Sequence, residues 1–275
     1  MKNLSEQTIL ITGSTDGLGK LVARHLAKQG ASIILHGRNP EKGKKVLDEI
    51  RESTKNDKLK YYNADLSSLQ EVNSLADTIL LDFKTLDVLV NNAGVGGGPK
   101  NSSQRELSKD GYELRFAVNY LSHFVLAYKL LELIKKSSPA RIINVSSIGQ
   151  EPLDFEDIMI EKGYDSLKAY RRSKLAQIMF TLDLAKELKE DNVTVNCLHP
   201  ATLMNTNMVY EFFGRTMSTV ESGAEALEYL ITSEELENVT GEYFNGKHRE
   251  RANEQAYDSE ARRKLRELSF EIMNV

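Results

Sequence analysis

Short apolar stretches that alternate with longer helical patterns are the feature that most constrains the fold of this chain. Runs rich in β-branched and apolar residues occur at 8–12, 32–36, 59–63, 87–91, 141–146, 193–198 and 242–244. Helical patterns follow them near 17–29, 40–54, 67–83, 110–136, 166–190, 220–232 and 253–273. Several runs are apolar throughout, which is typical of parallel strands covered by helices on both faces. We therefore predict an α/β fold: a Rossmann-type doubly wound parallel sheet of about seven strands, flanked by helices on both faces.

Composition and charge narrow the class of protein. The 275 residues, 40% hydrophobic and 28% charged, fit one domain spanning 1–275 with a large core. A net charge of −4 argues against a nucleic-acid partner. The one cysteine, Cys197, excludes an internal disulfide and a cysteine-based metal cluster, and we read it as a small buried hydrophobe. No apolar run approaches the roughly 20 residues that span a bilayer, and no hydrophobic leader precedes residue 8, so we expect a cytoplasmic protein without a membrane partner.

A glycine-rich stretch, TGSTDGLG at 12–19, follows the first predicted strand. Doubly wound sheets bind ligands beyond the carboxyl ends of their strands. Gly13 permits a tight turn, Gly17 lets the backbone approach a phosphate, and Gly19 allows close packing at the start of a helix. A bland turn can produce the same pattern, but its position between a strand and a helix favours nucleotide binding.

Four further motifs follow this stretch in order along the chain. NNAG occupies 91–94, AVNYLSHF contains Asn119, RIINVSS ends at Ser147, and YRRSK begins at Tyr170. Together with TGxxxGxG, these motifs resemble the short-chain dehydrogenase/reductase family over nearly the whole chain. The long acidic and apolar segment between Ser147 and Tyr170 resembles the branch of retinol dehydrogenases and protochlorophyllide reductases.

The resemblance implies an NADP(H)-dependent oxidoreductase that interconverts an apolar aldehyde or ketone and its alcohol by hydride transfer. Tyr170 would be the general acid and base, and Ser147 would hydrogen-bond the carbonyl oxygen. Lys174, at i+4, would lower the pKa of the phenol from its usual value near 10 and hold the nicotinamide ribose. Asn119 would anchor a water in a proton relay. We expect the adjacent Ser146 to bond the backbone instead.

The residues implied to bind the cofactor follow the strands. Gly37 follows the second predicted strand, at the position where an acidic residue would accept a hydrogen bond from a ribose 2′-hydroxyl. The next residue, Arg38, suits a 2′-phosphate. NADP(H) is therefore favoured, and NAD(H) stays open. The negative charge of Asp16 in the glycine-rich stretch argues against a 2′-phosphate nearby. The predicted set is Gly13, Ser14, Thr15, Asp16, Gly17, Leu18, Gly19, Arg38, Asp65, Leu66, Asn92, Ala93, Gly94, Tyr170, Lys174, Pro200 and Thr206.

Substrate contacts are expected from loops 95–108, 148–166 and 203–219, of which the last two are predicted insertions. We read Glu156 and Asp157 in the second loop as solvated, and His199 before the third as structural. The third loop is interpreted as a flexible apolar lid, with packing beneath a long loop as the alternative; its apolar residues are Met204, Met208, Tyr210, Phe212, Phe213 and Met217.

Other functions and assemblies stay open from the sequence. The protein could be a regulator that binds NADP(H) with little or no turnover, or a dehydrogenase that prefers NAD. An epimerase or dehydratase acting on a sugar nucleotide is disfavoured, because the segment 201–275 leaves little room for a larger substrate domain. Family members often pair through helix 166–190 and the helix that carries Asn119, which implies a homodimer, but monomers also occur in this branch. The sequence does not name the substrate.

Overall fold

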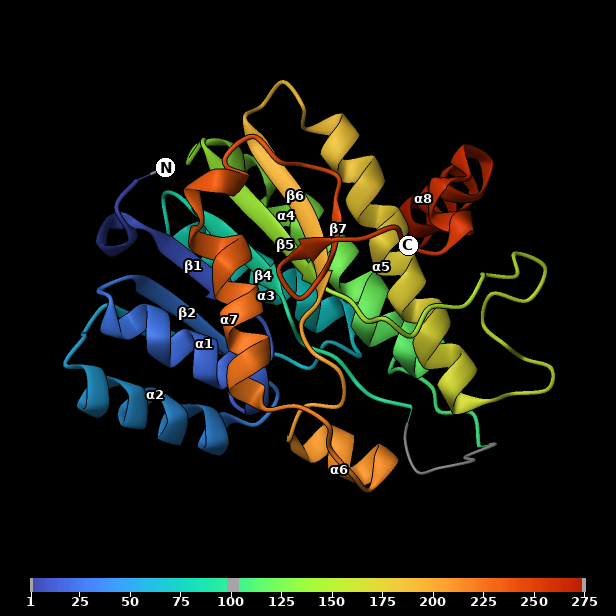
Figure 1. Ribbon diagram of the computed structural model, residues 1–275, viewed down its shortest axis with the longest axis horizontal. Coiled ribbons are helices and arrows are strands. Elements are labelled where there is room, and N and C mark those ends of the chain that lie inside the picture. Colours follow the sequence, from blue (N-terminus) through green and yellow to red (C-terminus); the bar gives the residue numbers. More distant parts are fainter. Residues whose placement is uncertain (1, 98–103, 274–275) are drawn as a thin grey trace.

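A central eight-stranded sheet organises the computed structural model, which describes residues 2–97 and 104–273 (Figure 1). The strand order is β3-β2-β1-β4-β5-β6-β7-β8. The strands are β1 (Thr8–Ile11), β2 (Ser32–Gly37), β3 (Leu59–Asn63), β4 (Val88–Asn91), β5 (Ala140–Val145), β6 (Val193–His199), β7 (Tyr243–Asn245) and β8 (His248–Arg249). The pairs from β3 to β7 are parallel, and β8 pairs antiparallel with β7. The predicted doubly wound parallel sheet is confirmed, with β8 as a two-residue addition at its edge.

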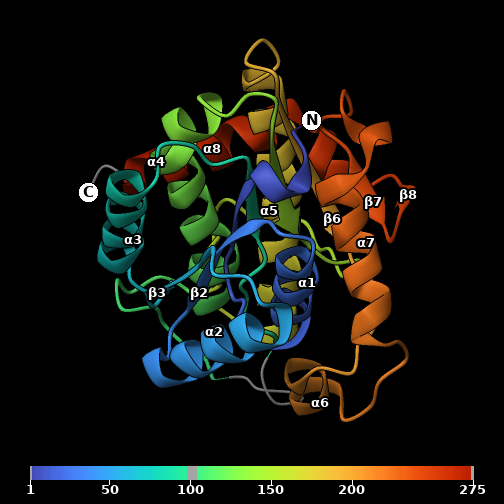
Figure 2. The same cartoon turned by 90° about the vertical axis from the view of Figure 1, so that its left-hand side faces the viewer.

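Helices cover both faces of this sheet (Figure 2). Helices α1 (Gly17–Lys28), α2 (Pro40–Thr54) and α7 (Val220–Thr232) share one hydrophobic core with one face of the strands. Helices α3 (Leu69–Asp82), α4 (Ser122–Lys135) and α5 (Ser166–Glu187) share the core on the other face with α8 (Ser259–Met273). Short 3-10 turns lie at Leu4–Glu6, Glu234–Leu236 and Glu254–Tyr257. Because strands such as β4 and β5 are buried along their whole length, their near-continuous apolar sequences follow from the two helical layers.

Side-chain caps fix where several of these helices begin. The Asn39 side chain accepts a hydrogen bond from the Lys42 amide at the start of α2, and Ser68 caps α3 in the same way. Asp165 accepts from the Lys168 amide at 2.6 Å and so sets the first turn of α5. The cap therefore fixes where α5 begins, and with it the position of each later residue around the helix axis.

Three predicted segments differ in detail from the structure. The helix predicted over 110–136 begins with a π-helical segment, η2 (Phe116–Leu121), and continues as α4. The loop predicted over 203–219 contains a helix, α6 (Asn207–Phe213), which stops at Gly214 with φ +64°. The C-terminal helix is broken at Asp258, whose carboxylate accepts from the amides of Glu260 and Ala261 and starts α8 anew.

Helix α8 lies against α5 on the side of the sheet that also carries α4 (Figure 1). The ring of Phe270 lies 5.1 Å from that of Phe124 and 4.9 Å from that of Tyr128, between centroids. Arg262 of α8 also forms an ion pair with Asp183 of α5 at 2.7 Å. The chain thus covers part of the helical face that we expected to meet a second copy.

No helix within residues 2–97 and 104–273 is long and apolar enough to cross a membrane.

Candidate active site

The glycine-rich loop after β1 interlocks with the loop after β4. A Cβ atom added to Gly13 would lie 2.7 Å from the Cα of Ala93, and one added to Gly19 would lie 2.5 Å from Nδ2 of Asn92. Such distances are too short for real carbon atoms, so both positions require glycine. The two predicted motifs therefore form one cradle, in which backbone rather than side chains faces a ligand.

Polar groups hold this cradle together. Oγ1 of Thr12 accepts hydrogen bonds from the amides of Asn92 and Ala93, each at 2.9 Å, and Asn92 Nδ2 donates to the Thr12 carbonyl at 2.8 Å. On the other side, Oγ of Ser14 accepts from the His36 amide at 2.9 Å. The loop after β1 is thus fastened to both neighbouring strands.

The start of α1 meets the start of α6. Gly17 has φ +47°, and a Cβ added there would lie 3.3 Å from Cγ2 of Thr206. Asp16 caps α1 by accepting from the Gly17 amide, and its carboxylate also binds Lys42 Nζ at 2.6 Å and Asn207 Nδ2 at 3.1 Å. The charge of Asp16, which argued against a nearby phosphate, is therefore paired with a cation.

The residues after β2, β3 and β6 complete the predicted cofactor set. Arg38 is exposed directly after Gly37, and a Cβ on Gly37 would lie 2.6 Å from Cγ2 of Thr15. Asp65 forms an ion pair with Lys109 Nζ at 3.1 Å. Two further residues of the set, Leu18 and Leu66, are buried in the hydrophobic cores, and Pro200 is buried at the end of β6.

Ser147, Tyr170 and Lys174 come together beyond the carboxyl end of β5. The Ser147 side chain hydrogen-bonds Tyr170. Lys174 Nζ lies 5.8 Å from the centre of the Tyr170 ring and donates to the Val145 carbonyl at 2.9 Å. Ser146 instead donates from Oγ to the Lys174 backbone carbonyl at 2.8 Å. The geometry places the second serine, rather than the first, against the phenol.

Burial dominates the electrostatics of this group. It raises the pKa of Tyr170, against the opposing effect of the Ser147 hydrogen bond. It also lowers the pKa of Lys174 to about 7. The direction for Tyr170 is opposite to the lowering that we expected from Lys174, because the effect of burial is the larger one.

Asn119 joins the loop after β4 to α5. Its Oδ1 accepts from the Val95 amide at 2.7 Å, and its Nδ2 donates to the Val95 carbonyl at 3.0 Å and to Ser173 Oγ at 2.9 Å. A Cβ on Gly94 would lie 3.2 Å from Asn119 Oδ1 and 3.7 Å from Lys174 Nζ. Both amide hydrogens of Asn119 are used within the protein, and its role towards a water stays a prediction.

Sequence reasoning missed two groups of residues around this centre. Gln177 and His123 are fully buried behind Lys174, and only the i+3 spacing of Gln177 from Lys174 could have indicated it. Arg115 donates from Nε to the Gly96 carbonyl at 3.0 Å and from NH1 to the Tyr164 hydroxyl at 2.9 Å. A buried arginine thus ties the loop after β4 to the insertion before α5, a contact that no local pattern indicates.

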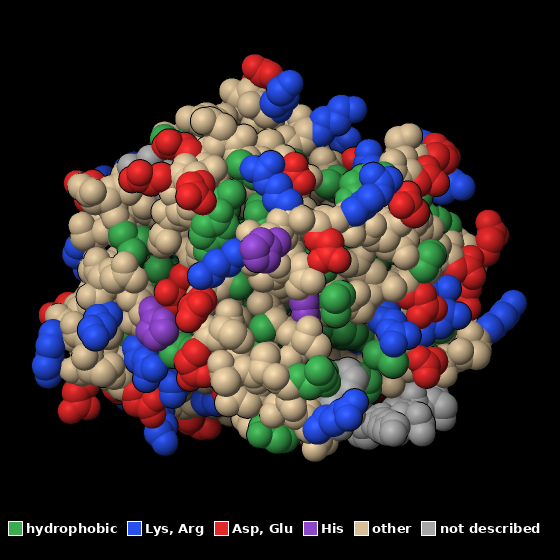
Figure 3. Space-filling view, in the orientation of Figure 1, with side chains coloured by type: hydrophobic (Ala, Val, Ile, Leu, Met, Phe, Trp, Pro, Cys, Tyr) green, Lys and Arg blue, Asp and Glu red, His purple; other side chains and the backbone are tan. Residues whose placement is uncertain are grey.

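The predicted lid is partly a helix with exposed apolar side chains. Met208, Tyr210 and Met217 are 41%, 53% and 69% exposed, and hydrophobic side chains appear along the lower edge of the space-filling view, where α6 lies (Figure 3). Added Cβ atoms on Gly96 and Gly97 would lie 3.1 Å from Met208 and 2.6 Å from Phe212, so α6 contacts the loop after β4. Residues 98–103 of that loop and the side chain of Phe213 lie outside the described residues.

The remaining polar residues singled out from the sequence lie in structural contacts. His199 Nε2 and Thr202 Oγ1 are 3.0 Å apart, and burial lowers the pKa of His199 to about 4. Asp157 accepts from the amides of Glu161 and Lys162, and Glu156 is exposed. Cys197 is fully buried, as expected.

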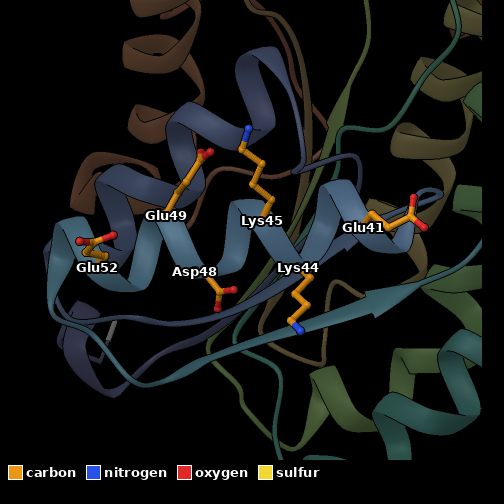
Figure 4. Close-up of a pocket in the computed structure, with 6 residues that line it drawn as sticks. All are labelled: Glu41, Lys44, Lys45, Asp48, Glu49 and Glu52. Carbon is orange, nitrogen blue, oxygen red and sulfur yellow. The ribbon is translucent and has the colours of Figure 1, made fainter.

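A shallow surface hollow on the outer face of α2 is lined only by charged side chains, Glu41, Lys44, Lys45, Asp48, Glu49 and Glu52 (Figure 4). They lie on successive turns of one helix, and Glu49 pairs with Lys20 at 2.6 Å. Within the part of the chain that the structure describes, no group of three or more His, Cys, Asp or Glu side chains is placed to hold a metal ion.

Comparisons with known proteins agree with this geometry. The family described as short chain dehydrogenase matches residues 7–215. The chain is 37% identical over 276 residues to retinol dehydrogenase 13 of Mus musculus, covering 94% of this chain and 81% of the relative. It is 33% identical over 282 residues to retinol dehydrogenase 12 of Homo sapiens, covering 99% and 88%.

A solved structure extends the similarity. A short chain dehydrogenase from Shigella flexneri, determined in complex with NADP, superposes with a TM-score of 0.72 at 27% identity, over 90% of this chain and 100% of the other. The chain therefore belongs to the short-chain dehydrogenase family, in its retinol-dehydrogenase-like branch, and is an oxidoreductase that acts on CH–OH or C=O groups.

Proposed function

We propose that the protein interconverts an apolar aldehyde or ketone and its alcohol with NADP(H), using Tyr170 as the acid and base. The observation that carries this proposal is the placement of Ser147, Tyr170 and Lys174 beside the glycine cradle, at the carboxyl ends of the central strands. A protein that only sensed a nucleotide would have no need of this serine–phenol–amine group.

The residues present fit a dinucleotide. Gly13, Gly17 and Gly19 carry no Cβ atoms at the start of α1, so a pyrophosphate can approach the backbone there. The strand end at Gly37 carries no carboxylate, and the exposed Arg38 beside it is suited to a 2′-phosphate. These features support NADP(H) over NAD(H) as the cofactor.

Each residue of the centre then has a distinct task. Bound in the cradle, NADP(H) would supply or accept the hydride at the substrate carbon. Tyr170 would donate its phenolic proton to the carbonyl oxygen during reduction and recover it from the alcohol during oxidation. Ser147, already bonded to Tyr170, would hold that oxygen and stabilise the charge that develops on it. Lys174, when charged, would stabilise the phenolate.

The surroundings support an apolar substrate. Ile148 directly follows Ser147 and is 52% exposed, and the exposed side chains of α6 lie near the cradle through Thr206. Relatives named retinol dehydrogenases act, by their names, on an apolar alcohol. We therefore place retinoids and similar lipophilic carbonyl compounds first among candidate substrates. A cytoplasmic location and a homodimer stay part of the proposal.

Replacing Tyr170 with Phe tests the chemistry. Because the variant keeps the ring and loses the transferable proton, we expect kcat to fall by about 10²–10⁴ while NADPH affinity changes little. Turnover would be measured with a panel of aldehydes, ketones and retinoids, and affinity by NADPH fluorescence.

The control removes a phenol elsewhere. Tyr229 bonds Glu235 on the exposed side of α7, so Tyr229→Phe should leave kcat unchanged. If the wild type bound NADPH but turned over no compound of the panel, the protein would be a nucleotide-binding regulator instead. A Tyr170→Phe variant with near-normal kcat would refute the role of the phenol.

A further inference from the structure

A buried polar chain lies behind Lys174 and leads away from Tyr170. Lys174 Nζ donates to Gln177 Oε1 at 2.9 Å. Gln177 Nε2 then lies 3.1 Å from His123 Nδ1, and His123 Nε2 lies 3.5 Å from Thr12 Oγ1. Gln177, His123 and Thr12 are all 0% exposed. This row of polar side chains therefore connects the amine of Lys174 to the start of the cradle, and none of its side chains beyond Lys174 is exposed to solvent.

The donor and acceptor chemistry of Lys174 and Gln177 favours one arrangement. A charged lysine can only donate, so Gln177 must turn its oxygen towards Lys174 and its NH₂ group towards His123. Nδ1 of His123 must then accept, which places the proton of the neutral ring on Nε2, facing Thr12. Burial and the nearby Lys174 lower the pKa of His123 to about 3, so the ring is neutral at physiological pH.

Two neighbours favour the opposite tautomer. Thr12 Oγ1 already accepts hydrogen bonds from the amides of Asn92 and Ala93, so it has no lone pair left for a proton on Nε2. The backbone carbonyl of Asn119 also faces the His123 ring and would accept a hydrogen bond from it. The charged or titratable groups that act on His123 within the described residues are Lys174 and His36. Gln177 would donate a hydrogen bond to Nδ1, whereas the Asn119 carbonyl would accept one from the ring, so the tautomer depends on which of these two bonds His123 makes.

We propose that Gln177 is a positioning residue for Lys174, and that His123 fixes the orientation of the Gln177 amide so that its oxygen always faces the amine. The inference rests on the proposed function for the role it gives to Lys174. A fixed acceptor stabilises the ammonium in a buried position where desolvation favours the neutral amine. Gln177 thus preserves the positive charge beside Tyr170, and His123 does so without touching Lys174.

The first test needs no turnover. In wild-type protein labelled with ¹⁵N-histidine, with NADP(H) absent, the ring nitrogen shifts of His123 should report the neutral Nε2–H tautomer from about pH 5 to 8, the His123→Leu variant providing the assignment. The Nδ1–H tautomer, bonded to Asn119, would overturn the proposal. A wild type without any turnover would refute the proposed function and leave this result standing.

The second test uses the pH profile of alcohol oxidation, which requires the Tyr170 phenolate. Gln177→Met removes the acceptor, so the acidic limb of kcat should move up by about one pH unit, and kcat below that limb should fall about tenfold. His123→Leu should produce a smaller shift in the same direction, because His123 then no longer holds the amide and only the ammonium orients its oxygen. The double variant should shift no further than Gln177→Met alone.

Other kinetic results would overturn the inference. An unchanged acidic limb in Gln177→Met would show that Gln177 does not support the charge of Lys174. A shift in Gln177→Met without one in His123→Leu would show that His123 does not orient the amide. A merely structural loss would lower kcat at every pH and leave the position of the limb unchanged.

Discussion

At the residue scale, the proposed preference for NADP(H) rests on two neighbouring positions after β2. Gly37 cannot take a side chain without displacing Thr15, since a Cβ there would lie 2.6 Å from Thr15 Cγ2. An acidic residue for the ribose 2′-hydroxyl is therefore disfavoured by packing and absent from the sequence at this position. In our proposal, the exposed Arg38 beside it sets the preference by its charge.

Replacing Arg38 with Asp should invert that preference. The change removes a charge-assisted bond to the 2′-phosphate and adds repulsion, so kcat/KM for NADPH relative to NADH should fall by about 100-fold. Steady-state kinetics with both cofactors measures this ratio. Arg249→Asp, on the exposed edge strand β8, is the matched control and should leave the ratio unchanged. An unaltered ratio in Arg38→Asp would mean that another residue meets the phosphate.

The sequence predicts individual site residues where a motif fixes them. The choice of Ser147 over Ser146 rests on adjacent residues pointing to opposite faces, and the structure turns Ser146 towards the Lys174 carbonyl. The role of Ser147 towards a substrate stays a prediction. The pKa of Tyr170 could not be predicted in this way. Its direction depends on how much water the folded chain removes around the ring, and that is set by packing between segments far apart in sequence.

At the element scale, β2 supports the glycine loop through a buried histidine. His36 Nδ1 accepts from the Gly13 amide at 3.2 Å, and its Nε2 lies 3.1 Å from the Ala64 carbonyl. Burial lowers the pKa of His36 from 6.5 to about 4, so the folded protein keeps the ring neutral. Protonation would put a donor against the Gly13 amide and break the bond that holds the loop.

This histidine makes stability depend on pH with a definite sign. The unfolded chain takes up a proton as pH falls below 6.5, whereas folded His36 does so only near 4, so stability falls as pH drops through that window. At about pH 5, His36 alone should cost about 2 kcal/mol relative to pH 7. Urea unfolding at both values measures this difference.

The matched variants separate His36 from the other titrating groups. His36→Gln should reduce the difference by about that amount, while His248→Gln, on the exposed strand β8, should leave it unchanged. An equal pH dependence in wild type and His36→Gln would show that the ring is not held neutral.

Helices and strands could be predicted where hydrophobic periodicity and capping residues indicated the same bounds. The predictions differ from the structure where contacts between distant segments decide the local conformation. All seven predicted strands occur. The central strands β1, β4, β5 and β6 are mostly apolar runs buried on both faces, which makes them easy to recognise. Helix α6 was predicted as a loop. Its seven residues are too few for a clear helical period, and Thr206 gives it no side-chain cap. The π-helical segment could not be distinguished in the sequence either, because it is as apolar as α4.

At the scale of the whole molecule, α8 completes one side of the protein. The two cores share a single sheet, which supports the prediction of one domain. The rings of Phe124, Tyr128, Phe180 and Phe270 form one cluster between α4, α5 and α8. A second copy would need to displace α8 or use another face.

Replacing Phe270 with Ala tests how much α8 contributes. Because Phe270 is partly buried against two rings, we expect the free energy of unfolding to fall by about 2–3 kcal/mol. Urea unfolding measures this, and light scattering would detect self-association through the uncovered rings. Leu81→Ala is the control, since Leu81 of α3 is 87% exposed and should change neither quantity. If the wild-type protein formed a dimer through α4 and α5, our conclusion that α8 covers this face would be wrong.

The interlocked cradle also has a consequence for how the chain matures during synthesis. The hydrogen bonds from Asn92 to Thr12 join residues separated by 80 positions. A nascent chain therefore carries β1, β2, β3 and the whole glycine-rich loop well before it carries the partner loop. During that interval the glycines have nothing to pack against, and closing so long a loop costs entropy that β4 must first offset. The cradle can therefore form only after β4 and the loop that follows it have been synthesised.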